Sequence, residues 1–182
     1  MRIISGTFRG RNLVSPKGEQ TRPTSSKMRG AVFSMIQQEI DNAAFLDLFS
    51  GSGAMGIEAL SRGASFAAFV DSSREAIHAI EKNIELCSIK NSTLVLMGDY
   101  LRMLDKLIRL PRRYDIVFAD APYAKESTSQ LLIDWFENHA LLQPGGRLLI
   151  EDANKIPPLT EKFTLISSRN SGKTFLHDFR GL

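Results

Sequence analysis

Short apolar runs alternate along this chain with longer segments in which apolar residues recur every three or four positions. The short runs predict buried strands at 45–49, 66–70, 93–97, 114–120 and 147–151. The longer segments predict helices at 26–39, 54–62, 73–87, 100–109 and 127–139. Because strands and helices of this length alternate, we predict an α/β fold in which a mostly parallel sheet is covered by helices on both faces.

The two ends of the chain depart from this alternation. Residues 163–167 and 174–179 predict two more strands, and the turn residues between them indicate an antiparallel C-terminal hairpin at the edge of a seven-stranded sheet. Two shorter pieces, 1–6 and 10–14, predict an N-terminal β-hairpin. We therefore expect a single domain over 1–182, made of an N-terminal arm at 1–25 and a Rossmann-like core at 26–182.

A glycine-rich turn follows the first strand of the core. Gly51, Gly53 and Gly56 have the G-x-G-x-x-G spacing, in which a backbone without Cβ atoms can approach a nucleoside closely. Asp71 lies at the end of the second strand, where a carboxylate can accept hydrogen bonds from both hydroxyls of a ribose. A tight turn with no ligand is the alternative interpretation of these glycines.

Acidic residues help to decide which nucleoside would bind. Asp47 lies inside the first strand, two residues before its expected end, where a carboxylate would repel the pyrophosphate of a dinucleotide such as NAD. The same carboxylate would suit a ligand that carries an ammonium and a sulfonium group. Asp71, Asp99 and Asp120 also end strands, so they are expected at one edge of the sheet. A metal site is a minor alternative for these carboxylates, and we expect no metal.

The most specific sequence feature is Asp120-Ala121-Pro122-Tyr123, directly after the fourth strand. Pro122 restricts Ala121 to extended conformations, so the carbonyl groups here point in fixed directions. An acceptor side chain beside such carbonyls can bind an amino group through its hydrogens, and Tyr123 offers a ring on which a base can stack. The alternative is a turn in which Asp120 only caps the next helix.

The charge of the chain is unevenly distributed. The net charge is +3, yet residues 1–30 contain seven Arg and Lys residues and one Glu, which leaves the remainder mildly acidic. A basic arm on an acidic domain suits contacts with phosphates, although a solvated basic surface has the same composition. Cys87 is the single cysteine, and the sequence has neither a long apolar run nor a secretion signal. We therefore expect a cytoplasmic protein without membrane association.

The chain resembles the class I S-adenosylmethionine-dependent methyltransferases, and within them the RsmD-type enzymes that methylate the exocyclic N2 of a guanine in 16S ribosomal RNA. The resemblance extends over essentially the whole chain. The segments that carry it are Arg2-Ile3-Ile4-Ser5-Gly6, Gly10-Arg11, Thr21-Arg22-Pro23-Thr24, Leu46-Asp47-Leu48-Phe49-Ser50-Gly51-Ser52-Gly53 and Gly172-Lys173-Thr174.

This resemblance implies S-adenosylmethionine as the cofactor, the 16S rRNA of the small ribosomal subunit as the partner, and guanine 966 as the expected target. The residues expected to bind the cofactor are Asp47, Gly51, Gly53, Gly56, Asp71, Ser72, Asp99 and Tyr100. The residues expected to hold the target base are Asp120, Ala121, Pro122 and Tyr123, and those expected to contact RNA are Arg9, Arg11, Arg22 and Lys27. We also expect a monomer.

The family's tetrapeptide usually reads Asp-Pro-Pro-Tyr or Asp-Pro-Pro-Phe, so Ala121 is a departure. The first proline would act through its backbone carbonyl, which alanine retains, and we expect a looser loop rather than an inactive enzyme. Three alternatives stay open at this point. The same tetrapeptide could hold adenine N6 in DNA or RNA, the glycine spacing suits an NAD-dependent oxidoreductase, and Ala121 would also be compatible with an RNA-binding protein that has lost activity.

Overall fold

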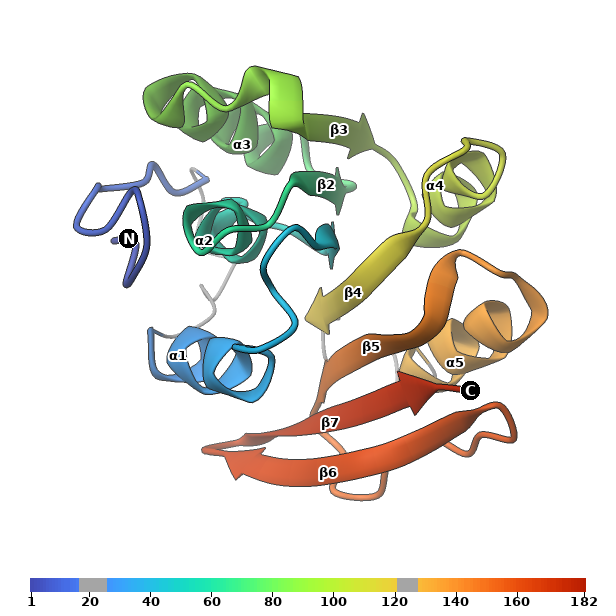
Figure 1. Cartoon of the computed structure of the whole chain (residues 1–182). Helices are drawn as coiled ribbons and strands as arrows, with labels where there is room; N and C mark the ends of the chain where they lie inside the picture. The colour runs from blue at the N-terminus through green and yellow to red at the C-terminus, as the bar shows by residue number, and fades with distance from the viewer. Residues whose placement is uncertain (17–25, 121–127) are drawn as a thin grey trace.

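The computed structural model describes residues 1–16, 26–120 and 128–182. Within these ranges, seven strands form one sheet in the order β3-β2-β1-β4-β5-β7-β6 (Figure 1). The strands are β1 Ala44–Leu48, β2 Phe66–Asp71, β3 Thr93–Met97, β4 Tyr114–Asp120, β5 Leu142–Asp152, β6 Phe163–Ser171 and β7 Thr174–Gly181. Strands β1 to β5 pair in parallel, whereas β7 runs antiparallel to both of its neighbours. This confirms the α/β class and the C-terminal hairpin.

Helices cover both faces of the sheet. Their bounds are α1 Ser26–Met35, α2 Ala54–Ser61, α3 Arg74–Cys87, α4 Tyr100–Leu107 and α5 Thr128–Asn138, with a short 3₁₀ turn, η1, at Lys90–Ser92. Helices α1, α2 and α3 lie on one face, and α4 and α5 lie on the other (Figure 1). Because β1 is buried along its whole length, its sequence is apolar at successive positions rather than at alternate ones. Asp47 is the one charged residue in that strand, and a buried carboxylate is costly unless it has a partner.

The first helix is shorter than the sequence predicts. Apolar spacing indicates a helix over 26–39, whereas α1 ends at Met35 and a turn follows, in which the Glu39 N–H donates to the Ile36 carbonyl. The side chain of Glu39 forms ion pairs with Arg147 (2.6 Å) and Arg180 (2.9 Å), on β5 and β7. These tertiary contacts direct the chain away from the helical path before β1 begins.

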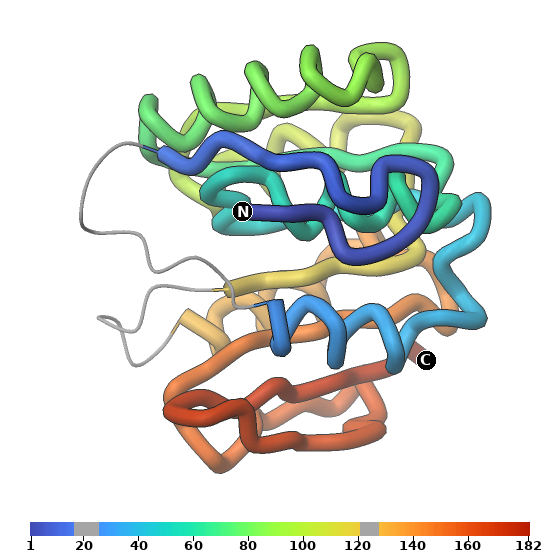
Figure 2. Tube along the Cα trace, turned by 90° about the vertical axis from the view of Figure 1, so that its left-hand side faces the viewer, coloured from blue at the N-terminus to red at the C-terminus, as the bar shows by residue number. Residues whose placement is uncertain are grey.

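The N-terminal arm is a hairpin-like loop rather than the pair of strands that the sequence predicts. Its antiparallel pairing amounts to one isolated bridge between Arg2 and Asn12. The reason lies in the partners of its backbone, because several N–H groups between residues 4 and 8 donate to α2 instead of to the opposite strand. The loop therefore lies along the outer side of α2 and α3 (Figure 2).

The C-terminal hairpin is longer than expected. The turn was predicted at 169–172, whereas β6 continues through Ser171 and pairs it with Thr174, so that Gly172 and Lys173 alone form the turn. Gly172 has φ of +76°, which fits the first central position of a two-residue hairpin turn that prefers glycine there. Strand β5 likewise begins at Leu142, within the segment 141–146 that was predicted as a turn, with an irregular register near Tyr114 and Ile116.

Candidate cofactor and RNA site

The glycine turn connects β1 to α2 at the carboxyl edge of the sheet. Gly51 and Gly53 have φ values of +54° and +74°, a left-handed conformation in which a Cβ atom is unfavourable. Gly56 is required for a different reason. A Cβ atom there would lie 2.4 Å from the ring of Phe69, so this glycine allows α2 to pack closely on β2. Gly51 and Gly53 thus serve the turn and Gly56 the packing of α2, and Gly51 is the one of the three that is not buried.

Asp71 fixes this turn from the neighbouring strand. The Gly51 N–H donates to Asp71 Oδ2 across 2.8 Å, and the Ser73 N–H donates to Asp71 Oδ1 across 2.8 Å. The side chain is half-buried, and Ser72 beside it is exposed. A carboxylate can accept roughly four hydrogen bonds, so one that receives these two keeps acceptor capacity for ribose hydroxyls. The expected position of Asp71 next to the glycine turn is therefore realised in the fold.

Asp47 lies beneath the same turn. Its side chain is 1% exposed, and Oδ2 accepts from the Gly56 N–H at 3.0 Å. Burial raises the pKa of Asp47 to about 8. The hydrogen bond from Gly56 opposes this rise, and the negative charges of Asp71 and Asp120 add to it. A ligand that brought positive charge to this place would relieve the repulsion among the three carboxylates. An added pyrophosphate would increase it.

Asp99 and Tyr100 lie at the end of β3, where α4 begins. Asp99 is exposed and caps the helix, because its Oδ1 accepts from the N–H groups of Leu101 (3.1 Å) and Arg102 (3.3 Å). The ring of Tyr100 lies 5.0 Å from that of Phe49 at an interplanar angle of 47°. The Tyr100 hydroxyl forms a hydrogen bond with Thr128, the first residue of α5. Burial raises the pKa of Tyr100.

Phe49 was not predicted as a site residue. It precedes the glycine turn and adopts φ of +61°, a conformation that is rare for an aromatic residue and costs about 1–3 kcal/mol. Such strain persists where the surroundings enforce it, and here the ring contact with Tyr100 connects the ends of β1 and β3. The sequence signal is a phenylalanine directly before Ser-Gly-Ser-Gly, although the apolar run predicts this residue as the end of the strand.

Asp120 is the last residue of β4 and pairs in register with Glu151 of β5. Strand β4 pairs with β1, with Leu48 opposite Ala119, so Asp120 lies on the strand next to Asp47, and its charge contributes to the raised pKa of Asp47. The carboxyl edge therefore collects acidic side chains from β1, β2 and β4, as predicted. Ala121, Pro122 and Tyr123 lie outside the described residues, and so does Arg22.

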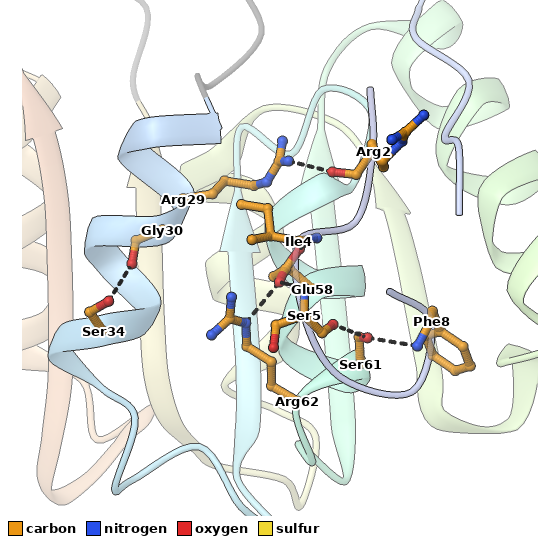
Figure 3. A network of polar contacts seen from close by, with 10 residues as sticks. All are labelled: Arg2, Ile4, Ser5, Phe8, Arg29, Gly30, Ser34, Glu58, Ser61 and Arg62. Carbon is orange, nitrogen blue, oxygen red and sulfur yellow. Dashed lines mark hydrogen bonds and ion pairs between the residues drawn. The ribbon is translucent and has the colours of Figure 1, made fainter. Parts of the chain in front are cut away.

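The arm is attached to α2 through a buried carboxylate. Glu58 is fully buried, and it accepts from the N–H groups of Ile4 (2.8 Å) and Ser5 (3.0 Å) while pairing with Arg62 at 2.8 Å (Figure 3). A Cβ atom on Gly6 would lie 1.7 Å from the Ser61 carbonyl oxygen, so glycine is required for this close approach. Glu58 does not stand out in the sequence, because an acidic residue in a helix gives no sign of burial.

Three of the residues expected to contact RNA are described, and all three are exposed: Arg9, Arg11 and Lys27. Arg11 also has local partners, since its Nη1 donates to the Leu86 carbonyl and its guanidinium lies 5.5 Å from the centre of the Phe8 ring. These contacts hold the basic group against the end of α3. Arg29, in contrast, is 1% exposed and donates from Nη2 to the Arg2 carbonyl at 2.7 Å, so it supports the arm from inside (Figure 3).

Among the described residues, no group of three or more His, Cys, Asp and Glu side chains could hold a metal ion. No helix in the described ranges has the length and apolar character needed to cross a membrane. A hollow of about 240 Å³ lies at the opposite, amino edge of the sheet, lined by residues such as Glu39, Asp115 and Gly146. Ligands of open parallel sheets bind at the carboxyl edge, so this hollow is not the expected site.

The strand order, with one antiparallel strand inserted beside β5, defines the fold of the class I S-adenosylmethionine-dependent methyltransferases. Solved structures share it. The Escherichia coli protein yhhF superposes with a TM-score of 0.85 at 26% identity, covering 100% of this chain and 97% of that one. An RNA methyltransferase from Salinibacter ruber, solved with S-adenosyl-L-homocysteine, gives a TM-score of 0.67 at 14% identity, covering 87% and 93% of the two chains.

The chain belongs to the family described as Conserved hypothetical protein 95, whose model matches residues 1–180. Several relatives carry the name Ribosomal RNA small subunit methyltransferase D, and they include the two that follow. The Escherichia coli K12 protein is 31% identical over 178 residues, which cover 95% of this chain and 86% of the relative. The Haemophilus influenzae protein is 30% identical over 175 residues, covering 94% and 89%. The resemblance to RsmD-type methyltransferases is therefore confirmed.

Proposed function

We propose that this protein transfers a methyl group from S-adenosylmethionine to the exocyclic N2 of a guanine in the 16S rRNA of the small ribosomal subunit, with guanine 966 as the target. The observation that carries the proposal is the placement of acidic residues at the carboxyl ends of successive strands of a methyltransferase sheet. Relatives named for small-subunit rRNA methylation support the choice of substrate.

The cofactor would lie along this edge. The backbone of Gly51 and Gly53 would pass under its methionine part, and buried Asp47 would face its positive charges. Asp71, with Ser72 beside it, would bind the ribose, and Asp99 with Tyr100 would bind the adenine. In support, Asp71 is already hydrogen-bonded to the glycine turn, and the Asp99 cap uses only its Oδ1 in the two helix bonds given above. A second carboxylate oxygen would remain to accept from the adenine amino group.

The chemistry requires mainly positioning, because a sulfonium methyl is already a good electrophile. Hydrogen bonds from the guanine amino group to Asp120 and to the Ala121 carbonyl would favour a pyramidal N2 whose lone pair points at the methyl carbon. The new N–C bond forms as the S–C bond breaks, which releases S-adenosylhomocysteine, and N2 then loses one proton. Tyr123 would stack on the base once it is unpaired.

The N-terminal arm would supply affinity for the RNA backbone. Arg9 and Arg11 of the arm are exposed, as is Lys27 in the first turn of α1, and Arg22 lies between them in the sequence. Contacts between basic side chains and phosphates position an RNA without selecting its sequence. Recognition of the target would then depend on the pocket after β4 and on an unpaired base, which RNA loops provide readily.

The direct test is transfer of a labelled methyl group to naked 16S rRNA, to small ribosomal subunits and to duplex DNA. We expect labelling of the rRNA or the subunit, with the label recovered as N2-methylguanosine after digestion. Label recovered on adenine N6, or on DNA alone, would refute the guanine assignment and favour an adenine methyltransferase. An Asp120→Asn variant that binds S-adenosylhomocysteine but transfers no methyl group would assign the chemistry to this site.

A further inference from the structure

Asn83 is a fully buried polar residue on the face of α3 that packs against the core. Its neighbours on that face are apolar, and they include Ile80, Ile84 and Cys87. A buried amide in such surroundings is costly unless its hydrogen-bonding groups are satisfied. This residue therefore has a specific role, and its partners show what that role is.

The amide of Asn83 bonds to two segments that are far apart in the sequence. The Val14 N–H donates to Asn83 Oδ1 at 2.7 Å, and Asn83 Nδ2 donates to the Val14 carbonyl at 2.9 Å. The same Nδ2 donates to the Ser52 carbonyl at 2.9 Å. One side chain thus satisfies three backbone groups, two of them in the arm and one in the glycine turn.

Both connected segments belong to the proposed binding surfaces. Ser52 lies between Gly51 and Gly53, so its peptide orients the backbone on which the cofactor would rest. Val14 continues the loop that carries Arg9 and Arg11, and Glu58 holds the beginning of that loop on α2. A second contact joins the same two segments, because the Ser52 hydroxyl donates a hydrogen bond to the Met1 sulfur across 3.7 Å.

We propose that Asn83 is a positioning residue that links the RNA-binding arm to the cofactor turn, so that binding of cofactor and binding of RNA strengthen each other. The inference rests on the proposed function, because it requires both ligands to bind. A cofactor that orders the peptides of the turn also fixes the Ser52 carbonyl. Through Asn83 this fixes Val14, so the arm has less freedom left to lose when RNA binds. By thermodynamic linkage, RNA must raise the affinity for the cofactor by the same factor.

The first experiment measures RNA affinity with and without saturating S-adenosylhomocysteine. The RNA probe is 16S rRNA, offered both naked and within small subunits. We expect the wild-type protein to bind RNA at least about fivefold more tightly with the cofactor product, at the lower end of measured couplings. In Asn83→Asp, which keeps the size of the side chain but replaces both donor hydrogens with an acceptor, this ratio should fall to about one.

A matched control distinguishes positioning from support of the fold. Ile84→Val alters the next residue of α3, which is also buried but has no polar atom in its side chain, so it should keep the wild-type ratio. If Asn83 only supported the fold, Asn83→Asp would lower the affinity for both ligands. The ratio of RNA affinities with and without S-adenosylhomocysteine would then stay at the wild-type value. That result would overturn the inference.

A second measurement needs no variant and holds even if Asn83→Asp fails to fold. Hydrogen exchange at the Val14 amide reports the Asn83 bond directly, because that N–H donates to Oδ1. S-adenosylhomocysteine should slow this exchange, and unchanged exchange would contradict the coupling. If the wild-type protein binds neither ligand, the proposed function fails. If it binds both with a ratio of one, only the present inference fails.

Discussion

The backbone N–H of Gly51 donates a hydrogen bond to Asp71 Oδ2 at 2.8 Å, which joins the turn after β1 to the last residue of β2. The carboxylate expected to bind the ribose is therefore also a structural part of the glycine turn. Because Asp71 Oδ1 accepts from the Ser73 N–H, the side chain is held in one orientation before any ligand arrives. The Asp71 side chain therefore loses little freedom when a ribose binds to it.

Asp71→Ala should weaken both the fold and the site. The loss of hydrogen bonds to a charged acceptor should lower the free energy of unfolding by about 1.5–3 kcal/mol. The affinity for S-adenosylhomocysteine should fall by at least about tenfold, because the ribose contacts and the order of the turn are both lost. Thermal unfolding and calorimetric titration measure the two effects. A variant that is less stable but keeps wild-type cofactor affinity would show that Asp71 does not bind the cofactor.

The buried carboxyl of Asp47 predicts a pH dependence of stability in the cofactor-free protein. Its folded pKa of about 8 lies above the ordinary value of 3.8, so the neutral form is favoured by folding. The stabilisation is complete below about pH 4 and is lost as the pH rises through about 8. Asp47→Asn, which stays neutral and can still accept from the Gly56 N–H, should show a smaller fall in Tm across this range. Parallel pH profiles of Tm for the two proteins would contradict the burial argument.

The same carboxyl predicts proton release when the cofactor binds. Positive charge on the cofactor would favour ionised Asp47 and lower its pKa, so binding near pH 7 should expel a fraction of a proton. Titration of S-adenosylmethionine in two buffers with different ionisation enthalpies measures the number released. We expect release in the wild-type protein and none from this position in Asp47→Asn. Equal release by both proteins would show that Asp47 does not face the cofactor charge.

We expect the loss of the Tyr100 hydroxyl to reduce turnover while leaving cofactor binding intact. The hydroxyl contacts Thr128, which begins α5 directly after the segment that follows Asp120, and the Tyr100 ring contacts Phe49. Tyr100→Phe keeps the ring contact and removes the hydrogen bond, so kcat should fall by about tenfold or more through misplacement of the target base. Cofactor affinity should change by less than about twofold.

Tyr114 provides the matched control for this substitution. It is a buried tyrosine at the start of β4, at the opposite edge of the sheet, and burial raises its pKa to about 12. Tyr114→Phe also removes a hydroxyl from the interior but should leave kcat unchanged. Equal kcat values in the two variants and the wild-type protein would mean that Tyr100 has no part in positioning.

The arm predicts a change in the salt dependence of RNA binding. Arg9→Glu combined with Arg11→Glu should remove about two phosphate contacts and lower the slope of log K against log salt by roughly 1.4, at about 0.7 for each contact with single-stranded nucleic acid. Lys106→Glu with Arg109→Glu makes the same change of charge at the end of α4, where both residues are exposed. Only the first pair should alter the slope. Equal slopes of log K against log salt for both variants would show that the arm is a solvated basic surface that does not contact the RNA phosphates.

The order of elements could be predicted from the sequence because each depends on a local pattern. Apolar runs bounded by turns define β1 to β5, and the glycine spacing with Asp71 indicates the edge at which a nucleoside would bind. The predicted proximity of Asp71 to the glycine turn is realised by the bond to Gly51. These features depend on backbone geometry, which the spacing of residue types encodes well.

The features that the sequence did not reveal depend on tertiary contacts. Helix α1 ends early because Glu39 turns towards Arg147 and Arg180, more than a hundred residues away in the chain. The predicted N-terminal hairpin is reduced to one bridge because Glu58 and Ser61 take up backbone N–H groups of the arm. Asn83 resembles any surface asparagine in sequence, although its position among apolar helix residues was a usable sign of burial.

The most direct test of the central claim is identification of the nucleoside that receives a labelled methyl group when the purified protein, S-adenosylmethionine and small-subunit rRNA are combined. The account predicts a single labelled product, N2-methylguanosine, that is absent with Asp120→Asn. Label in N6-methyladenosine, or full activity in the Asp120 variant, would contradict it.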